Sequence, residues 1–207
     1  MLGASKNVIN AYFEWVDTPE EADFTLAFID SPISDGYSVA DREAGGNGYL
    51  PVMLQYRPYT AENAREVSIA GGDFREASTN RSYRGKTNYA ANESDLDIIL
   101  DAKKRMGDKP VIAVVRMHHP MVMTELEPYV DAILVDFGVT QEVICELVSG
   151  KSMPKGLLPI EMPANMATVE EHFEDKPFDY EVYKDSQGHS YEFGYGLDWN
   201  GIISDER

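Results

Sequence analysis

The stretch "SDLDIILDAKKRMGDKPVIAVVRM", residues 94–117, places an amphipathic segment directly before a short apolar run. Residues 94–107 repeat apolar side chains at helical spacing, begin at a capping serine, carry basic residues near the end and close on a glycine. This pattern predicts a helix. Residues 109–117 are apolar and short, which is typical of a strand buried on both faces. The stretch therefore predicts a helix that leads into a parallel strand.

Similar elements lie on both sides of this stretch. "ADFTLAFID" (22–30) and "VDAILVDFG" (130–138) are predicted to be buried strands, and "TQEVICELVSG" (140–150) a second capped helix. "GLLPIEMP" (156–163) is predicted to be an edge strand bounded by prolines. Strands and helices that alternate in this rhythm form a parallel sheet covered by helices. We therefore expect an α/β fold: a three-layer sandwich with a mostly parallel sheet and helices on both faces.

Two segments stand outside this alternation. Residues 60–68 show a weak helical pattern, and residues 164–207 are acidic and aromatic without a period. We expect the sandwich domain to span 21–163, with 164–207 packed on it as a long C-terminal extension.

The charge balance limits the classes of partner. The 207 residues include 18 basic and 36 acidic side chains, which gives a net charge of −18. Such a surface argues against nucleic acid or an anionic membrane as the main partner. No stretch approaches the roughly 18 apolar residues of a membrane span.

The sequence indicates neither a metal nor an organic cofactor. Cys145 is the single cysteine and is flanked by apolar residues, so we expect a buried structural thiol. His118 and His119 are adjacent, and no second ligand pair has suitable spacing. No glycine-rich nucleotide-binding motif opens a helix.

A glycine-rich, charged loop follows the strand at 22–30 directly. The loop, "SDGYSVADREAGGNGYLP" (34–51), holds these candidate site residues: Asp35, Tyr37, Asp41, Arg42 and Glu43. Glycosidases place two carboxyl groups near one sugar and surround the sugar with polar and aromatic side chains. The loop therefore favours carbohydrate chemistry, and a solvated acidic loop is the alternative.

A second polar excursion spans residues 69–93. It has no helical or strand period and carries several basic residues in an acidic chain. An excursion of this length inside a domain is functional or mobile. Its arginines, Arg81 among them, and Tyr83 are candidates for contacts over the mouth of an active site, and a mobile surface loop is the alternative.

The order of these motifs resembles the C-terminal α/β sandwich domain of glycoside hydrolase family 3. The resemblance covers roughly residues 20–200. Beyond the strands, the matching positions are Gln141-Glu142, Gly150, Pro154, Gly156, Leu158-Pro159, Pro163 and Phe193-Gly194-Tyr195-Gly196-Leu197. The chain departs from the family pattern at "FGVTQE", which lacks the proline that the family carries before Gln-Glu.

The resemblance implies a retaining β-glycosidase of the β-glucosidase type, which hydrolyses terminal β-linked sugars. In that family the nucleophilic aspartate comes from a preceding (β/α)8 barrel, and this domain often supplies the acid/base glutamate. A barrel needs about 250 residues, so we expect it outside this chain, with 1–20 as the linker from it. The isolated chain is then expected to be inactive, and the parent protein's barrel is its expected partner.

The resemblance also assigns roles within the opening loop. Asp35 takes the position of the family's acid/base glutamate, with Glu43 or Asp41 as the alternative carboxyl. Substrate contacts fall to five residues: Tyr37, Asp41, Arg42, Arg81 and Tyr83. The Asp41-Arg42 pair has an alternative role as an ion pair that ties the loop down. A non-catalytic module for substrate shaping or carbohydrate binding remains the other interpretation. The sequence leaves the compartment open, because a targeting signal would lie in the expected N-terminal part.

Overall fold

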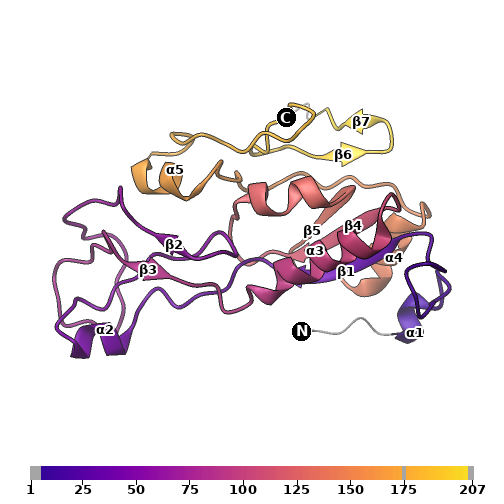
Figure 1. The fold of residues 1–207 in the computed structure, drawn as a ribbon. Helices are drawn as coiled ribbons and strands as arrows, with labels where there is room; N and C mark the ends of the chain where they lie inside the picture. Colours follow the sequence, from indigo (N-terminus) through magenta and orange to yellow (C-terminus); the bar gives the residue numbers. More distant parts are fainter. Residues whose placement is uncertain (1–5, 174–175, 205–207) are drawn as a thin grey trace.

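The computed structural model describes residues 6–173 and 176–204. Its centre is a parallel sheet of three strands in the order β1-β4-β5 (Figure 1). The strands are β1 (Thr25–Asp30), β4 (Val111–Arg116) and β5 (Ala132–Asp136). Their register places Ala113 of β4 beside Ala27 of β1 and Ile133 of β5. The three predicted buried strands are confirmed.

Both faces of the sheet are covered, because side chains that point to opposite faces are both buried. Ala113 and Val115 are completely buried on one face, and Val114, which points to the other, is only 2% exposed. Helix α3 (Ser94–Met106) packs on β1 and β4 through Leu96 and Ile99. The predicted α/β fold with a parallel, helix-covered sheet is therefore confirmed.

The other helical segments around the sheet lie before β1, between β4 and β5, and after β5. Helix α4 (Gln141–Val148) contacts the short α1 (Lys6–Ile9). Two single turns, η1 (Met123–Glu125) and η2 (Glu127–Tyr129), connect β4 to β5. Cys145 is buried in α4, as predicted. None of the helices in the described residues is long and apolar enough to span a membrane.

The start of α3 differs from the prediction. Ser94 is the first helical residue and not the cap, and no side chain caps the helix at Glu93. Asn92 instead anchors the start of the helix. Its side-chain amide donates to the carbonyl oxygen of Ser31 at 3.1 Å and to the carboxylate of Asp95 at 3.0 Å. The helix is thereby tied to the end of β1. Gly107 closes the helix with φ 61°, as expected.

The predicted edge strand at 156–163 is wrong. The segment forms no strand: Pro163 makes one isolated antiparallel bridge with Val182, and Pro159 and Pro163 have no N–H with which to continue a ladder. Its backbone pairs instead with the C-terminal residues: Leu158 donates to Tyr195 at 2.8 Å, and Met162 donates to Tyr191 at 2.9 Å. The weak helical pattern at 60–68 also forms no helix.

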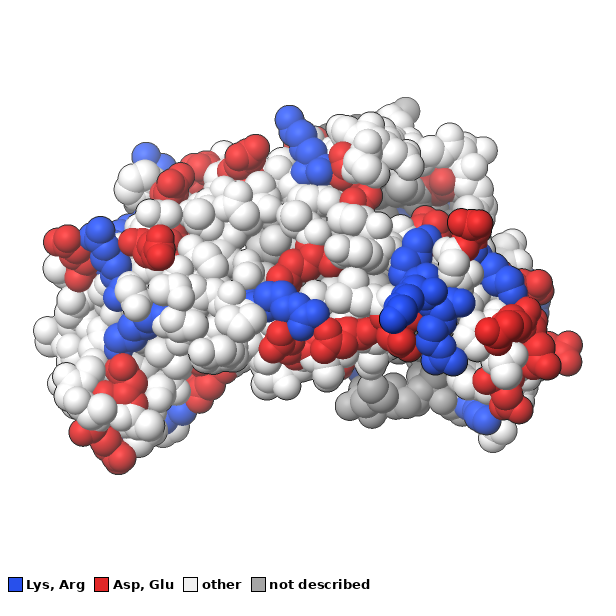
Figure 2. Space-filling view, in the orientation of Figure 1, with Lys and Arg blue, Asp and Glu red and all other residues white. Residues whose placement is uncertain are grey.

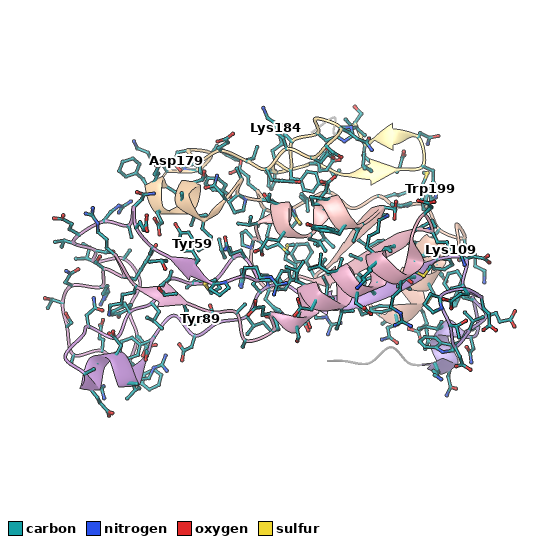
Figure 3. The ribbon with its side chains drawn as sticks, in the orientation of Figure 1. Tyr59, Tyr89, Lys109, Asp179, Lys184 and Trp199 are labelled. Atoms are coloured by element: carbon teal, nitrogen blue, oxygen red, sulfur yellow. The ribbon has the colours of Figure 1, made fainter. Side chains whose placement is uncertain are left out.

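The C-terminal residues run along one side of the sheet domain (Figure 1). They form α5 (Met166–Glu171) and a small hairpin of β6 (Leu197–Asp198) and β7 (Gly201–Ile202). Tyr183 reaches the hydrophobic core, and Tyr191 packs against it. Trp199 is 60% exposed at the turn of the hairpin (Figure 3).

Residues 34–93, which we call the distal lobe, extend from the carboxyl end of β1 (Figure 1). The lobe holds α2 (Val39–Glu43) and a two-residue pair of β2 (Tyr59–Thr60) with β3 (Thr87–Asn88). Tyr56 is the one residue of the lobe in the main core cluster. The rest of the lobe combines buried apolar side chains of its own, such as Met53 and Ala61, with many side-chain hydrogen bonds. Ligand-binding sites of open α/β sheets form at the carboxyl ends of the strands, where this lobe begins.

Candidate functional site

The opening loop folds back on itself and so presents its polar side chains to the second excursion. Tyr37 and Tyr49 form an antiparallel bridge, and their rings meet edge to face at 5.2 Å. Between them, the Ser38 hydroxyl accepts a hydrogen bond from the Asp41 N–H at 3.2 Å and caps α2. Gly48 has φ 89°, and a Cβ there would lie 2.4 Å from the Tyr37 ring. Only glycine fits that position.

Asp35 is held by an arginine of the second excursion. Arg75 donates to both oxygens of the Asp35 carboxylate, at 2.8 and 2.9 Å. On its other side Arg75 binds Asp73 in the same bidentate way, with both distances 2.7 Å. Hydrogen bonds from Arg75 lower the pKa of Asp35, and they lower the pKa of Asp73 to about 2. The Asp35 side chain remains 60% exposed, so an ionised carboxylate faces solvent.

Arg75 also organises the aromatic residues around it. Its guanidinium lies 4.9 Å from the Tyr37 ring centre and 5.6 Å from that of Phe74. The carbonyl oxygen of Arg75 accepts hydrogen bonds from the Tyr37 hydroxyl at 3.0 Å and from Arg42 at 2.6 Å. The structure thus brings three of the predicted residues, Asp35, Tyr37 and Arg42, around one arginine.

Asp41 has a separate partner. Its carboxylate pairs with the Lys86 ammonium and accepts a hydrogen bond from the Gly48 N–H at 2.8 Å. Lys86 also donates to the Asn47 side-chain oxygen at 2.8 Å. The hydrogen bond from Lys86 lowers the pKa of Asp41. The sequence left a structural ion pair with Arg42 as the alternative role of Asp41. Asp41 does form an ion pair that fixes the loop, but its partner is Lys86 and not Arg42.

The other predicted residues do not join the Arg75 cluster. Arg81 forms a bidentate pair with Glu76, both distances 2.8 Å, and donates to the Ile69 carbonyl at 2.7 Å. Tyr83 is half-buried near a turn, where its carbonyl accepts from the Lys86 N–H at 3.1 Å. Glu43 is exposed at the end of α2. Arg81 is therefore occupied in fixing the excursion.

Arg75 and Lys86 are the residues whose roles the sequence did not reveal. The sequence feature that could have indicated them is the mixture of basic and acidic residues at 69–93. Arg75 and Lys86 of this segment form ion pairs with the opening loop. Figure 2 shows this mixture on the lobe, at the left of the view, where basic and acidic side chains lie next to each other. The lobe therefore presents paired charges and no extended basic patch on this face.

The two adjacent histidines follow the carboxyl end of β4, the central strand of the sheet. His118 Nε2 is 3.1 Å from the Asp30 carboxylate, and His119 Nδ1 is 2.8 Å from the Pro120 carbonyl oxygen. Within residues 6–173 and 176–204, no three His, Cys, Asp or Glu side chains are grouped so that they could hold a metal ion.

The fold and the lobe define an α/β sandwich domain with a polar, aromatic loop cluster after its first strand. Residues 10–199 match the family model described as "Glycosyl hydrolase family 3 C-terminal domain". The chain belongs to this family.

Similar proteins carry β-glucosidase names. The chain is 31% identical to "Probable beta-glucosidase C" of Aspergillus flavus over 89% of this chain and 21% of the relative. It is 28% identical to "Beta-glucosidase C" of Emericella nidulans over 73% of this chain and 24% of the relative. It is 26% identical to "Periplasmic beta-glucosidase/beta-xylosidase" of Dickeya chrysanthemi over 56% of this chain and 16% of the relative. The matches thus span about a quarter of these proteins or less. No solved structure matches the chain.

Proposed function

We propose that this chain is the C-terminal domain of a retaining β-glycosidase of the β-glucosidase type. It acts with a (β/α)8 barrel of the same parent protein, which lies outside this chain and carries the nucleophile. The substrates are glycosides with terminal β-linked sugars. Family membership and the names of the relatives support this reaction class. Their greater length is consistent with a further catalytic domain.

The bidentate Asp35–Arg75 pair carries the proposal for what the lobe contributes. A general acid holds its proton at the working pH and therefore needs a raised pKa. Arg75 moves the pKa of Asp35 in the opposite direction. An exposed, ionised carboxylate instead accepts hydrogen bonds from sugar hydroxyl groups. We assign Asp35 to substrate binding beside the barrel. Tyr37 and Arg42 hold Arg75 in position through hydrogen bonds to its carbonyl oxygen.

Glu43 is the second candidate for a direct role, as the acid/base of the reaction. It lies on the same loop as Asp35, is exposed at the end of α2 and stands outside the Asp35–Arg75, Asp41–Lys86 and Glu76–Arg81 pairs. An acid/base catalyst protonates the leaving oxygen, so its removal affects poor leaving groups most.

Leaving-group dependence in the parent enzyme separates these roles. Asp35→Asn is compared with Glu43→Gln on an alkyl β-glucoside and on a dinitrophenyl β-glucoside. We expect Asp35→Asn to lower kcat/KM by a similar factor, about tenfold, on both substrates, because one charged hydrogen bond is lost. A loss confined to the alkyl glucoside would instead make Asp35 the acid/base.

The same series tests the second candidate. If Glu43→Gln loses far more activity on the alkyl glucoside than on the dinitrophenyl glucoside, Glu43 is the acid/base. Equal and small effects on both substrates remove it from the reaction. Glu62→Gln is the matched control, because Glu62 is an exposed glutamate of the same lobe. A parent enzyme that hydrolyses no β-glycoside would overturn the proposed function itself.

A further inference from the structure

The distal lobe is attached to the rest of the fold at its base and at α5. At the base, the Tyr56 hydroxyl donates to the Asp30 carbonyl at 2.7 Å, and the Val122 N–H donates to the Leu54 carbonyl at 2.7 Å. Tyr56 is completely buried in the main core cluster, so this attachment combines hydrogen bonds with apolar packing. The second attachment is to α5, which lies above β2 in the view of Figure 1.

The contact between the lobe and α5 includes a buried carboxyl group. Glu170 is only 6% exposed, and one of its carboxyl oxygens accepts a hydrogen bond from the Asn63 N–H at 2.9 Å. The other oxygen is buried and has no hydrogen-bond partner in the described part of the chain. In the same contact, the Arg65 guanidinium donates to the His172 carbonyl at 2.8 Å and lies 5.3 Å from the Phe173 ring centre. One titratable group therefore lies inside the contact.

The charge of Glu170 weakens this contact. An ionised carboxylate with one unpaired oxygen has lost the hydrogen bonds that water would give it, which is costly, and burial raises the pKa of Glu170. A protonated carboxyl group keeps the acceptor for Asn63 and carries no charge. The ionisable groups that face or flank Glu170 come from both sides of the contact: Tyr59, Glu62 and Arg65 of the lobe, and Glu171 and His172.

We propose that Glu170 is a proton-controlled latch: the protonated side chain holds the distal lobe against α5, and ionisation loosens that side of the lobe while the base stays attached. The latch is fully closed below the pKa of about 4.3 of a free glutamate. It loosens as the pH rises through the higher pKa of the latched state. Acidic conditions therefore fix the lobe, and neutral conditions make it mobile. The latch does not depend on the proposed function, because it requires only this chain.

Hydrogen exchange of this chain, followed by mass spectrometry at pH 4.5, 6.0 and 7.5, tests the latch. Each rate is divided by the intrinsic exchange rate at the same pH. Over this range we expect exchange at 61–66 and 166–172 to become about tenfold faster, because ionisation leaves a buried charge with an unpaired oxygen. Exchange at 54–57, in the base, should change little. Glu170→Gln keeps an acceptor without the charge, so both segments should stay protected at all three pH values.

Two control variants identify the group that titrates. Glu171→Gln and His172→Gln should keep the pH dependence of the wild type, because Glu171 is exposed and His172 contacts Arg65 through its backbone carbonyl. A pH dependence that survives in Glu170→Gln overturns the proposal, and its loss in His172→Gln would make the histidine the switch. Exchange at 61–66 that does not change with pH in the wild type, or that changes equally at the base, overturns it as well.

Glu170→Ala separates the hydrogen bond from the charge. This variant removes the acceptor for the Asn63 N–H, so both segments should exchange fast at every pH. Protection in Glu170→Ala that equals the protection in Glu170→Gln would mean that the contact does not need the hydrogen bond, which would overturn the latch. If Glu170→Ala does not fold, the comparison of wild type with Glu170→Gln still decides.

Discussion

Glu170 of α5 accepts a hydrogen bond from the Asn63 N–H at 2.9 Å and so joins the C-terminal residues to the distal lobe. Glu170 is only 6% exposed, and its second carboxyl oxygen has no hydrogen-bond partner among the described residues. Tyr59 of β2 lies on the α5 side of the lobe (Figure 3). Burial raises the pKa of Glu170. The contact therefore holds two parts of the fold together at the cost of a buried charge.

This arrangement predicts that Glu170→Gln stabilises the chain at neutral pH. A carboxyl with a raised pKa in the folded state takes up protons on folding, so its contribution to stability falls as the pH rises above its unfolded pKa of about 4.3. Glutamine keeps an acceptor for Asn63 and removes the charge. We expect a gain of about 1 kcal/mol at pH 7.5, which corresponds to a Tm about 2–4 °C higher, and a smaller gain at pH 4.5.

Thermal unfolding at the two pH values checks this prediction. Glu171→Gln, on the neighbouring residue, is the control for a general loss of negative charge. A lower Tm for Glu170→Gln at pH 7.5 would mean that the charged form is the stabilising one.

Met162 provides a test of how the segment 156–163 contributes without forming a strand. Its side chain is fully buried in the hydrophobic core, and its N–H donates to Tyr191 at 2.9 Å. We expect Met162→Ala to destabilise the chain by about 2–5 kcal/mol, because it leaves a cavity in a packed core. Met153→Ala is the control, since Met153 is 45% exposed. Chemical denaturation measures both, and similar small losses would contradict the core role.

The sheet was predictable because its information is local. The apolar runs at 22–30, 109–117 and 130–138 are short, and they alternate with segments whose apolar residues have helical spacing. The burial of the strands and their parallel order follow from this alternation. The segment at 156–163 failed because apolar content alone does not distinguish a strand from an extended core segment. Its partners, Tyr183 to Tyr195, lie far along the chain.

The site was predictable only in part, for a related reason. The sequence identified Asp35, Asp41 and Arg42 as members of one charged loop, but pairing across a sequence distance is not visible in composition. Asp35 binds Arg75, 40 positions away, and Asp41 binds Lys86, 45 positions away. The decision between a catalytic and a binding carboxylate depends on these partners, because they set the pKa of each carboxyl.

Arg75 is predicted to hold the opening loop in place. Arg75→Met leaves Asp35 and Asp73 side by side without a cation, while it keeps most of the apolar stem. Because both carboxyls have lowered pKa values, the contribution of Arg75 is present above their unfolded pKa of about 4 and is lost as the pH falls toward 2. At pH 7 we expect amide hydrogen exchange at 35–49 to become at least about tenfold faster.

Hydrogen exchange followed by mass spectrometry measures this effect. Arg84→Met is the matched control, because Arg84 pairs with Glu66 on the surface, where its side chain is 48% exposed. We expect little change for that variant. Exchange at 35–49 that is the same in wild type and Arg75→Met would show that the loop is held by the Tyr37–Tyr49 bridge alone.

Lys86 and Asp41 are predicted to act as one unit. Their side chains are 21% and 28% exposed, and Lys86 also binds Asn47, whose amide donates to the Ser82 carbonyl at 2.6 Å. Lys86→Met leaves the Asp41 charge unpaired in a partly buried site, so it should cost more stability than Asp41→Asn. The double variant Lys86→Met/Asp41→Asn should recover part of that loss, with a coupling of about 1 kcal/mol. Urea unfolding of the three variants closes the cycle. Additive losses would mean that Asn47, and not the ion pair, carries the contribution of Lys86.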